Sequence, residues 1–465
     1  MEKIDLLIIN PPFHTRNGGG SFFPLGLGYI ISSVVAQGFS WRVIDCTQMV
    51  HSFHKDDLQI FEERLSIELQ KYSPLVVGMG PCITSQLQAL KVISNCCKKV
   101  FPSTPIFAGG PLASIQGQEW LFFEDLHIDF IIKGDGENAV PDAIRTIKDS
   151  GCFTNSRLLS WQGYSYVNEI QNIDSILFPY RELGNKDTFS TRRSATNTIQ
   201  KQAAMITSRG CPYKCNYCVS GNLRRSRTVR KRSVDNIIAE MDYLHRDHKI
   251  HDVIFYDDCF FSNPQTAFSD VKSFCEALIC KNLDISWQIE LRPDLLVALD
   301  DDSILLLIES GCRQINIGIE KVSASGLEFL GKADSFPGLK QKNFHIREIS
   351  NISLSATFIL GGGNETRNDV IHLIKESKSL GLNFAHFNPL FVYPGTPLYN
   401  QVFDNDRAWA EIICNDTLPW GEIVFENDSL KRSDLLELVD YAYSEFYKDT
   451  EHSSQLMISD RFNIK

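Results

Sequence analysis

The chemistry of this chain centres on one segment, Ser208-Arg-Gly-Cys-Pro-Tyr-Lys-Cys-Asn-Tyr-Cys-Val219. It places Cys211, Cys215 and Cys218 in a CxxxCxxC pattern, and three thiolates on one loop can hold iron. Closed zinc and iron–sulfur sites take four protein ligands, so three ligands leave one metal position open for a small molecule. The apolar run at 203–207 before the loop is typical of a β-strand. The segment therefore predicts an open metal cluster at a strand end.

With Tyr217 directly before the last cysteine, this segment resembles the signature of the radical S-adenosylmethionine (SAM) superfamily. In that superfamily a [4Fe-4S] cluster binds the amino and carboxylate groups of SAM at its open iron and reduces SAM to a 5′-deoxyadenosyl radical. The resemblance implies that Cys211, Cys215 and Cys218 ligate the cluster and that Tyr217 lies at the cofactor site. It also implies an electron donor such as a flavodoxin or a ferredoxin as partner.

Composition favours a soluble, cytoplasmic protein of two or three domains. The chain has 465 residues, which is more than one hydrophobic core usually covers. Its content of 43% hydrophobic and 22% charged residues is typical of a soluble globular protein. The longest apolar runs are too short to span a bilayer, and the first residues lack the layout of a signal peptide. The remaining cysteines show no paired framework, as expected in a reducing compartment. A net charge of −11 argues against nucleic acid as the main partner.

One local basic run departs from the acidic balance of the chain. Its members are Arg224, Arg225, Arg227, Arg230, Lys231 and Arg232. Two interpretations stay open for it: contact with a phosphate-bearing substrate, or an ordinary solvated loop.

Residues 1–150 are predicted to form a doubly wound parallel sheet. Short apolar runs at 4–9, 41–44, 75–78, 105–108 and 129–132 alternate with segments of helical period, including one at 25–36. Strands alternating with helices indicate a parallel sheet covered on both faces. Ligands of such sheets bind beyond the carboxyl ends of the strands.

Glycines and small polar residues follow these predicted strands, where backbone can approach a large ligand. They resemble the cobalamin-binding domain at the N-terminus of one large radical SAM class, in the Asn-Pro-Pro opening, the Pro-Leu-Gly-Leu-Gly helix start that ends at Gly28, and the Gly-Asp-Gly-Glu loop. The resemblance implies that cobalamin contacts Asn10, Pro11, Gly80, Thr84, Ser85, Gly109, Gly110, Gly134, Gly136 and Glu137.

The histidine that ligates cobalt in cobalamin mutases has no counterpart here, because no Asp-x-His-x-x-Gly occurs in the chain. His14 lies near the appropriate strand end, and we expect it to be an ordinary loop residue rather than a cobalt ligand. A domain that keeps the fold but binds no cobalamin is the alternative.

Residues 151–200 are polar and are predicted to connect two domains. Apolar runs at 203–207, 253–256, 285–289, 314–319, 354–360 and 384–387 then alternate with helices, which indicates a (β/α)6 partial TIM barrel over 201–397. One predicted helix has Ser233 as N-cap and an apolar stripe typical of core packing. Residues 398–465 are predicted to form a small helical C-terminal cap over the barrel mouth, with a helix near 430–446.

Charged residues follow the predicted barrel strands, where a parallel barrel places its chemistry. Asp257 and Asp258 follow the second strand and suit the ammonium of SAM. Glu290 and Arg292 follow the third, and arginine can bind a carboxylate through two hydrogen bonds. Glu320 ends the fourth strand and is suited to accept bonds from ribose hydroxyls. The family resembled here places SAM-binding groups after its second and third strands, so the resemblance, together with these positions, implies that the five residues bind SAM.

The resemblance implies methylation of an unreactive centre in a small molecule or natural-product intermediate, with methyl transfer from cobalamin. An alternative is a radical rearrangement, cyclisation or oxidation in which cobalamin carries electrons or is absent. A non-catalytic iron–sulfur binding protein is a third possibility, which the charged residues on several strand ends disfavour, since a sensor has no need of them. Sequence alone does not encode the substrate, because its pocket would be built from loops.

Overall fold

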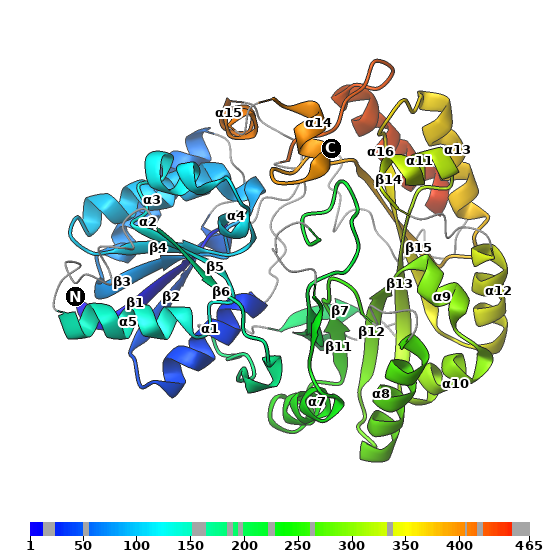
Figure 1. The fold of residues 1–465 in the computed structure, drawn as a ribbon, viewed down its shortest axis with the longest axis horizontal. Helices are drawn as coiled ribbons and strands as arrows, with labels where there is room; N and C mark the ends of the chain where they lie inside the picture. Colours follow the sequence, from blue (N-terminus) through cyan, green and yellow to red (C-terminus); the bar gives the residue numbers. More distant parts are fainter. Residues whose placement is uncertain are drawn as a thin grey trace. The chain divides into compact units, whose positions relative to one another are not determined.

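The computed structural model describes residues 1–12, 24–49, 55–150, 164–183, 189–193, 199–221, 228–260, 266–332, 338–404, 407–415 and 422–448. The chain divides into two compact units (Figure 1). The first comprises Met1–Thr188, Asn222–Arg225 and Tyr393–Ile423, and the second comprises Phe189–Gly221, Ser226–Val392 and Val424–Lys465.

A parallel sheet of six strands forms the centre of the first unit, in the order β2-β1-β3-β4-β5-β6. The strands are β1 (Glu2–Asn10), β2 (Trp41–Asp45), β3 (Tyr72–Met79), β4 (Ile106–Gly109), β5 (Phe130–Gly134) and β6 (Tyr164–Asn168). The five predicted strands are confirmed. β6 adds a sixth inside the segment expected to be a connector.

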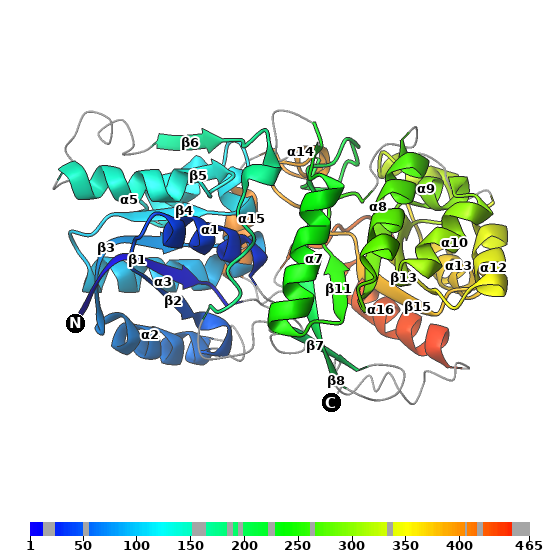
Figure 2. The same cartoon turned by 90° about the horizontal axis from the view of Figure 1, so that it is seen from below.

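Helices cover both faces of this sheet, as a doubly wound fold requires. The helices are α1 (Leu25–Ala36), α2 (Lys55–Leu69), α3 (Leu87–Val100), α4 (Pro111–Ser114) and α5 (Ala139–Ser150), with short turns η1 (Cys46–Gln48), η2 (Thr84–Gln86), η3 (Leu121–Asp125) and η4 (Ile173–Ser175). Helices α1 and α5 lie together on one face, and α2 and α3 lie together on the other (Figures 1 and 2). The apolar faces of α1 and α5 pack on buried strand residues such as Leu6, Val76 and Phe130.

The second unit contains a seven-stranded sheet in the order β15-β14-β13-β12-β11-β8-β7. Its six parallel strands are β8 (Ile199–Met205), β11 (Asp252–Phe255), β12 (Ser286–Leu291), β13 (Cys312–Glu320), β14 (Ser353–Leu360) and β15 (Phe384–Pro389). β7 (Ser190–Arg193) adds an antiparallel strand beside β8. β15 and β7 stand at opposite ends of the sheet, so the predicted partial barrel of six βα units is confirmed.

The helices of the second unit are α7 (Val234–His248), α8 (Ala267–Lys281), α9 (Pro293–Ala298), α10 (Asp301–Glu309), α11 (Ala324–Phe329), α12 (Leu339–Ile349), α13 (Arg367–Lys378) and α16 (Arg432–Tyr447). Helix α7 shows how the sequence fixes such an element. The Ser233 hydroxyl caps it by accepting a hydrogen bond from the amide of Asn236, at 3.2 Å. Ile237, Met241 and Leu244 form its buried stripe, so the predicted core role of this helix is confirmed.

The C-terminal part of the chain is shared between the two units. Helices α14 (Pro397–Val402) and α15 (Ala408–Asn415) lie in the Tyr393–Ile423 segment of the first unit. Helix α16 belongs to the second unit and packs against α13, β14 and β15. The division of the chain therefore does not coincide with the boundary expected at residue 398.

Among the described residues, no helix combines the length and the hydrophobicity that crossing a lipid bilayer requires.

Candidate active site

The three-cysteine loop leaves the carboxyl end of β8, where a parallel barrel places its chemistry. Two short strands at the ends of the loop region, β9 (Ser208–Arg209) and β10 (Arg230–Lys231), pair antiparallel. Cys211, Cys215 and Cys218 are all half-buried, and the amide of Cys218 donates a hydrogen bond to the carbonyl of Cys215, at 3.3 Å. The loop therefore keeps its three thiols on one short, folded piece of backbone.

The surroundings of the thiols differ. A hydrogen bond from the Cys259 thiol lowers the pKa of Cys211 to about 7, and burial raises the pKa of Cys215 and of Cys218. Across the described residues, no group of three or more histidine, cysteine or acidic side chains is gathered closely enough to hold a single metal ion. A [4Fe-4S] cluster spreads its thiolates over separate irons, so three half-buried thiols on one loop fit its donor set.

Two adjacent aspartates after β11 hold the start of the cysteine loop. Asp257 is buried, and its carboxylate accepts hydrogen bonds from the amide of Thr207 (3.0 Å) and from the hydroxyls of Thr207 (2.9 Å) and Ser208 (2.6 Å). Burial raises the pKa of Asp257 to about 6. Asp258 is exposed and accepts a long bond from the amide of Gly210, at 3.3 Å. The oxygens of Asp257 are thus occupied by the loop, whereas Asp258 faces solvent.

Arg292 after β12 lies beside the cysteine loop. Its guanidinium carbon is 3.6 Å from the centre of the Tyr213 ring, and its Nε donates to Asp294 at 2.9 Å. Its positive charge contributes to lowering the pKa of Cys211, and it opposes the rise at Cys215. The stacked ring and the carboxylate therefore hold a cation next to the thiols.

Glu320 at the end of β13 is buried within a small polar group. The Tyr217 hydroxyl donates a hydrogen bond to its carboxylate, and the Lys332 ammonium lies 3.3 Å from it. Lys332 also donates to the carbonyl of Gly318. Glu320 has a φ of +67°, which is costly for a residue with a side chain and is held here by these partners.

Glu290 differs from its neighbours because it is exposed, although it lies within the central strand β12. Partial desolvation by the protein around its carboxylate and, next, the nearby carboxylates of Glu320 and Asp258 raise its pKa. Among the described residues, none donates a hydrogen bond to its carboxylate or forms an ion pair with it. Glu290, Glu320 and Asp258 therefore give this strand edge an excess of negative charge, which Lys332 partly offsets.

Sequence reasoning missed the residues that fix the site from a distance along the chain. Asn216 in the cysteine loop donates its side-chain amide to the carbonyl of Phe329, and its backbone amide to that of Leu330, both at 2.9 Å. Lys321 is buried and donates to the carbonyl of Gly361 (2.8 Å) and to Glu365 (2.6 Å). The available signal in the sequence was a lysine directly after an apolar strand. Lysine is rarely buried without a partner, so a lysine at such a position suggests a buried ion pair.

The described part of the basic run has a structural role that neither interpretation anticipated. Arg230 and Arg232 are buried, and Arg232 pairs with the fully buried Glu240 at 2.5 Å. Lys231 forms an exposed ion pair with Asp270, at 2.6 Å. For Arg230 and Arg232 the interpretation as a solvated loop is therefore wrong, and the guanidinium of Arg232 is engaged by Glu240 and Asn236. Arg224, Arg225 and Arg227 lie outside the described residues.

In the first unit, the expected ligand residues do lie at the carboxyl ends of the strands, but most have partners within the protein. Asn10 donates its side-chain amide to Asp45 at 2.9 Å, and the carbonyl of Pro11 accepts from Gln86 at 3.4 Å. A Cβ at Gly80 would lie 2.8 Å from the carbonyl oxygen of Gly109. These residues are small and neutral, which suits a flat edge against a large ring, and the glycines let neighbouring loops pack closely.

Thr84 and Ser85 engage a residue more than 300 positions away in the sequence. The Thr84 hydroxyl contacts both carboxylate oxygens of Glu422 at 2.7 Å, and the Ser85 amide donates to the same group at 3.1 Å. All three residues are buried. Burial raises the pKa of Glu422 to about 7.

The Gly-Asp-Gly-Glu loop after β5 is held by local partners. The amide of Gly134 donates to the Ser114 hydroxyl (3.1 Å), and Asp135 accepts from the amide of Ile170 (2.8 Å). A Cβ at Gly136 would lie 3.1 Å from the side chain of Ile30. The loop therefore packs between Ile30 of α1, Ser114 of α4 and the backbone of Ile170.

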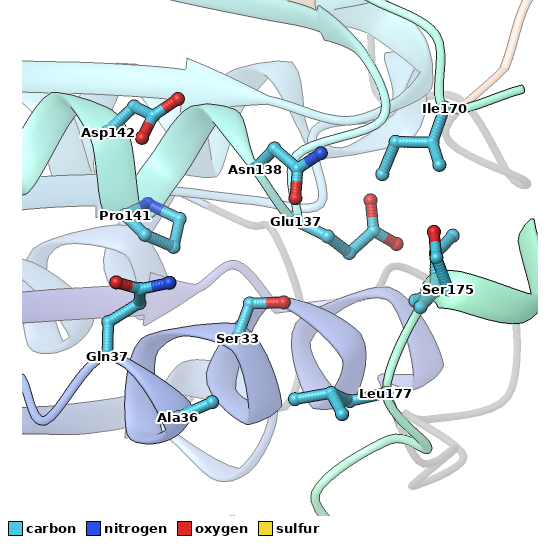
Figure 3. Close-up of a pocket in the computed structure, with 11 residues that line it drawn as sticks. Ser33, Ala36, Gln37, Glu137, Asn138, Pro141, Asp142, Ile170, Ser175 and Leu177 are labelled. Atoms are coloured by element: carbon cyan, nitrogen blue, oxygen red, sulfur yellow. The ribbon is translucent and has the colours of Figure 1, made fainter. Parts of the chain in front are cut away.

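Glu137 lines a pocket of about 280 Å³ in the first unit (Figure 3). Ser33 of α1, Gln37 directly after α1, Asp142 of α5, and Ser175 and Leu177 also line it. The Glu137 carboxylate points toward Ser175 and Ile170 (Figure 3). His14 lies outside the described residues.

Comparisons with known proteins agree with this architecture. The radical SAM superfamily model matches residues 205–376, and the B12 binding domain model matches residues 14–144. An uncharacterized methyltransferase of Pyrococcus horikoshii, PH0819, is 27% identical over 96% of this chain and 93% of its own length. The anaerobic magnesium-protoporphyrin IX monomethyl ester cyclase of Cereibacter sphaeroides is 21% identical over 95% of this chain and 70% of its own.

A solved structure shares the fold of both units. The radical SAM methyltransferase TsrM of Kitasatospora setae, determined with cobalamin and a [4Fe-4S] cluster, superposes with a TM-score of 0.61 at 17% identity. The match covers 86% of this chain and 74% of TsrM. The chain is therefore an enzyme of the radical SAM superfamily that carries a B12-binding domain ahead of its radical SAM domain, and these domains imply SAM, a [4Fe-4S] cluster and cobalamin as cofactors.

Proposed function

We propose that this enzyme is a cobalamin-dependent methyltransferase that acts on an unactivated centre of a small molecule or natural-product intermediate. The observation that carries the proposal is the three-cysteine loop at the carboxyl end of β8, in one chain with a doubly wound B12-type sheet. One relative that matches nearly the whole chain, PH0819 of Pyrococcus horikoshii, is named a methyltransferase. When bound, the cluster and SAM supply a 5′-deoxyadenosyl radical, and cobalamin supplies a transferable methyl group.

The residues of the second unit then have separate tasks. Cys211, Cys215 and Cys218 hold the cluster, and Asp257 and Asn216 fix the loop that carries them. This assigns Asp257 to positioning, because its oxygens already accept bonds from Thr207 and Ser208.

SAM binding falls to the charged residues around that loop. The carboxylates of Asp258, Glu290 and Glu320 suit the ammonium and sulfonium charges of SAM, and Tyr217 supports Glu320. Arg292 suits the SAM carboxylate. Its cation is already oriented by Tyr213 and Asp294.

Cobalamin binding falls to the carboxyl edge of the first sheet. We retain the predicted contacts and divide them into main and secondary contacts. Thr84, Ser85, Gly109 and Gly110 form the loops after β3 and β4, and Asn10 and Pro11 extend this edge at β1. The contacts assigned to Gly134, Gly136 and Glu137 are secondary, because Gly136 packs on Ile30 and Glu137 points into its own pocket.

The cellular setting follows from the chemistry. Reducing SAM requires an external electron, which we assign to a flavodoxin or ferredoxin in the cytoplasm. The described cysteines are all free thiols, which suits a reducing compartment. As domains we propose 1–150 for cobalamin, 151–200 as connector, 201–397 for the barrel and 398–465 as cap, with 393–423 attached to the cobalamin domain.

One relative favours a second candidate function. The magnesium-protoporphyrin cyclase matches 95% of this chain, and its name describes ring closure rather than methyl transfer. A radical cyclisation or oxidation therefore remains the alternative.

Product analysis separates the two functions. The anaerobically reconstituted enzyme is given SAM, a reductant and a cell extract of small molecules. A methyltransferase forms S-adenosylhomocysteine together with 5′-deoxyadenosine and transfers label from methyl-labelled SAM into a product. Formation of 5′-deoxyadenosine without S-adenosylhomocysteine or transferred label would overturn the proposal in favour of the alternative.

A further inference from the structure

The segment Tyr393–Ile423 is an excursion of the barrel chain that folds with the first unit. Its two ends are held together in the second unit, where Phe391 and Val424 form an antiparallel bridge and the amide of Phe425 donates to Leu390. Between these ends, α14 and α15 belong to the first unit. The B12 binding domain model ends at residue 144, so it does not include this segment.

Several specific contacts fix the excursion to the first unit. The buried Trp409 donates its indole N–H to the Oε1 of Gln118, at 2.7 Å. Gln88 donates its side-chain amide to the carbonyl of Ile413, at 2.9 Å. The Arg407 guanidinium lies 4.6 Å from the centre of the Trp120 ring. The excursion is therefore an integral layer of the first unit.

Glu422, near the end of the excursion, brings a buried carboxylate to the loop that contains Thr84 and Ser85. Its carboxylate lies against η2, the three-residue turn directly before α3, whose first amides have no partner within the turn. It accepts bonds from the Thr84 hydroxyl and the Ser85 amide. Among the described residues, burial raises its pKa and hydrogen bonds from Thr84 and Ser85 oppose that rise, so neutral donors support the carboxylate.

The loop that Glu422 holds is linked to the two loops beside it. Gln86 accepts from the amide of Ile83 (3.0 Å) and donates to the carbonyl of Pro11 after β1 (3.4 Å). The amide of Cys82 donates to the carbonyl of Gly109 after β4, at 2.9 Å. Fixing Thr84 and Ser85 therefore helps to set the loops after β1, β3 and β4, the three loops assigned to cobalamin.

We infer that Glu422 is a positioning residue for cobalamin, supplied to the B12-binding domain by the C-terminal excursion. The inference rests on the proposed function, because it presupposes that this sheet edge binds cobalamin. Glu422 acts through Thr84 and Ser85, and its role is to hold their loop in the conformation that accepts the corrin ring.

The test compares Glu422→Ala, Glu422→Gln and Thr84→Val with a matched control, Glu411→Gln, which alters an exposed glutamate of the same excursion. Hydroxocobalamin is titrated into each full-length protein and followed by its absorbance. We expect Glu422→Ala and Thr84→Val to weaken binding at least tenfold, because each removes hydrogen bonds to a buried group. Glutamine keeps an acceptor for both donors, so Glu422→Gln and Glu411→Gln should stay within threefold of the wild type.

Hydrogen exchange of the peptide that spans residues 80–90 supplies a second readout. We expect the Ser85 amide to exchange at least tenfold faster in Glu422→Ala, with peptides of β1 and β5 unchanged. If Glu422→Ala fails to fold, Thr84→Val decides the question at the other end of the contact. Wild-type cobalamin affinity in Glu422→Ala or Thr84→Val would overturn the inference alone, whereas a wild-type protein that binds no cobalamin would overturn the proposed function as well.

Discussion

Single residues at the strand ends were predictable by type, but their partners were not. Sequence indicated that Asp257, Asp258 and Glu320 follow barrel strands, because apolar runs mark the strands. It gave no sign that Asp257 bonds to residues 50 positions earlier, or that Tyr217 and Lys332 engage Glu320. Such contacts arise from tertiary packing, which local pattern does not encode.

Each of the three cysteines should be essential, so the loss of any one of them should disrupt the cluster. Changing Cys211, Cys215 or Cys218 to Ala removes one anionic iron ligand, so each variant should lose iron and form no 5′-deoxyadenosine. The exposed Cys280 offers a matched control, and Cys280→Ala should keep both properties. Iron analysis and chromatography of SAM products measure the outcome. Four bound irons with active SAM cleavage in the triple variant would contradict the assignment.

The two adjacent aspartates should separate cluster binding from SAM binding. Asp257→Ala leaves the Thr207 amide and two hydroxyls without an acceptor, so stability should fall by about 2–4 kcal/mol and iron content should drop. Asp258→Asn should keep the iron and weaken SAM binding about tenfold or more, because a charged contact is lost. Thermal unfolding, iron analysis and SAM titration distinguish the two. If both variants lost iron and SAM affinity to the same extent, the two aspartates would not have separate roles.

The buried Glu422 should make stability depend on pH in a defined direction. Burial raises its pKa from 4.5 to about 7, so the folded protein keeps a proton that the unfolded chain loses above pH 4.5. Its contribution is therefore most favourable below pH 4.5, falls as pH rises to about 7 and then stays constant. Glu422→Gln removes this dependence, so its unfolding free energy relative to wild type should rise by about 3 kcal/mol between pH 4.5 and pH 8. Urea unfolding measures it, and a constant difference across pH would contradict the predicted titration.

At the scale of elements, the pattern of apolar runs in the sequence identified the buried strands of both sheets but missed the polar strands at their edges. The five predicted strands of the first sheet and the six of the barrel all form. β6 and β7 were missed because their sequences, Tyr-Ser-Tyr-Val-Asn and Ser-Thr-Arg-Arg, lack the apolar run that marks a strand buried on both faces. Strands at a sheet edge need no such run, so pattern alone does not separate them from loops.

The exposed edge of the barrel sheet is closed by tyrosine hydroxyls of α16. Tyr447 accepts from the amide of Ala385 and donates to its carbonyl, both at 3.0 Å, and Tyr443 accepts from the amide of Phe387 at 3.3 Å. These hydroxyls take the place of a neighbouring strand beside β15. Helix α16 therefore acts as an edge cover for the sheet, and this pairing had no signature in the sequence.

Removing the Tyr447 hydroxyl should weaken that edge. Tyr447→Phe leaves a buried amide and carbonyl unpaired, so we expect a loss of about 1–3 kcal/mol in unfolding free energy. Tyr443→Phe should cost less, since it removes one long bond. Tyr441→Phe is the control, because Tyr441 lies on the same helix and is exposed. Chemical denaturation of all three variants checks the order, and a Tyr447→Phe protein as stable as the control would exclude the edge role.

At the scale of the whole molecule, the chain builds two units with separate cores, and the proposed function gives each unit its own cofactors. The sequence indicated this division through its two series of βα units, but it placed the C-terminal segment in a single cap. Local pattern identified α16 as a helix, yet it carried no information on which core each C-terminal piece would join. That choice depends on contacts such as Trp409 with Gln118, which lie 291 residues apart.

Separate cores predict that each cofactor can be lost without the other. Gly110 has a φ of +107°, and a Cβ there would lie 2.6 Å from the backbone nitrogen of Cys82, so Gly110→Ala should push the loops after β3 and β4 apart. We expect this variant to lose cobalamin while it keeps its iron, and the triple Cys→Ala variant to lose iron while it keeps cobalamin. Gly26→Ala is the control, because a Cβ at that helical position meets nothing within 4 Å. Cobalt and iron content of each anaerobically reconstituted protein gives the answer. Simultaneous loss of both metals in either variant would show that the two units depend on each other for cofactor binding.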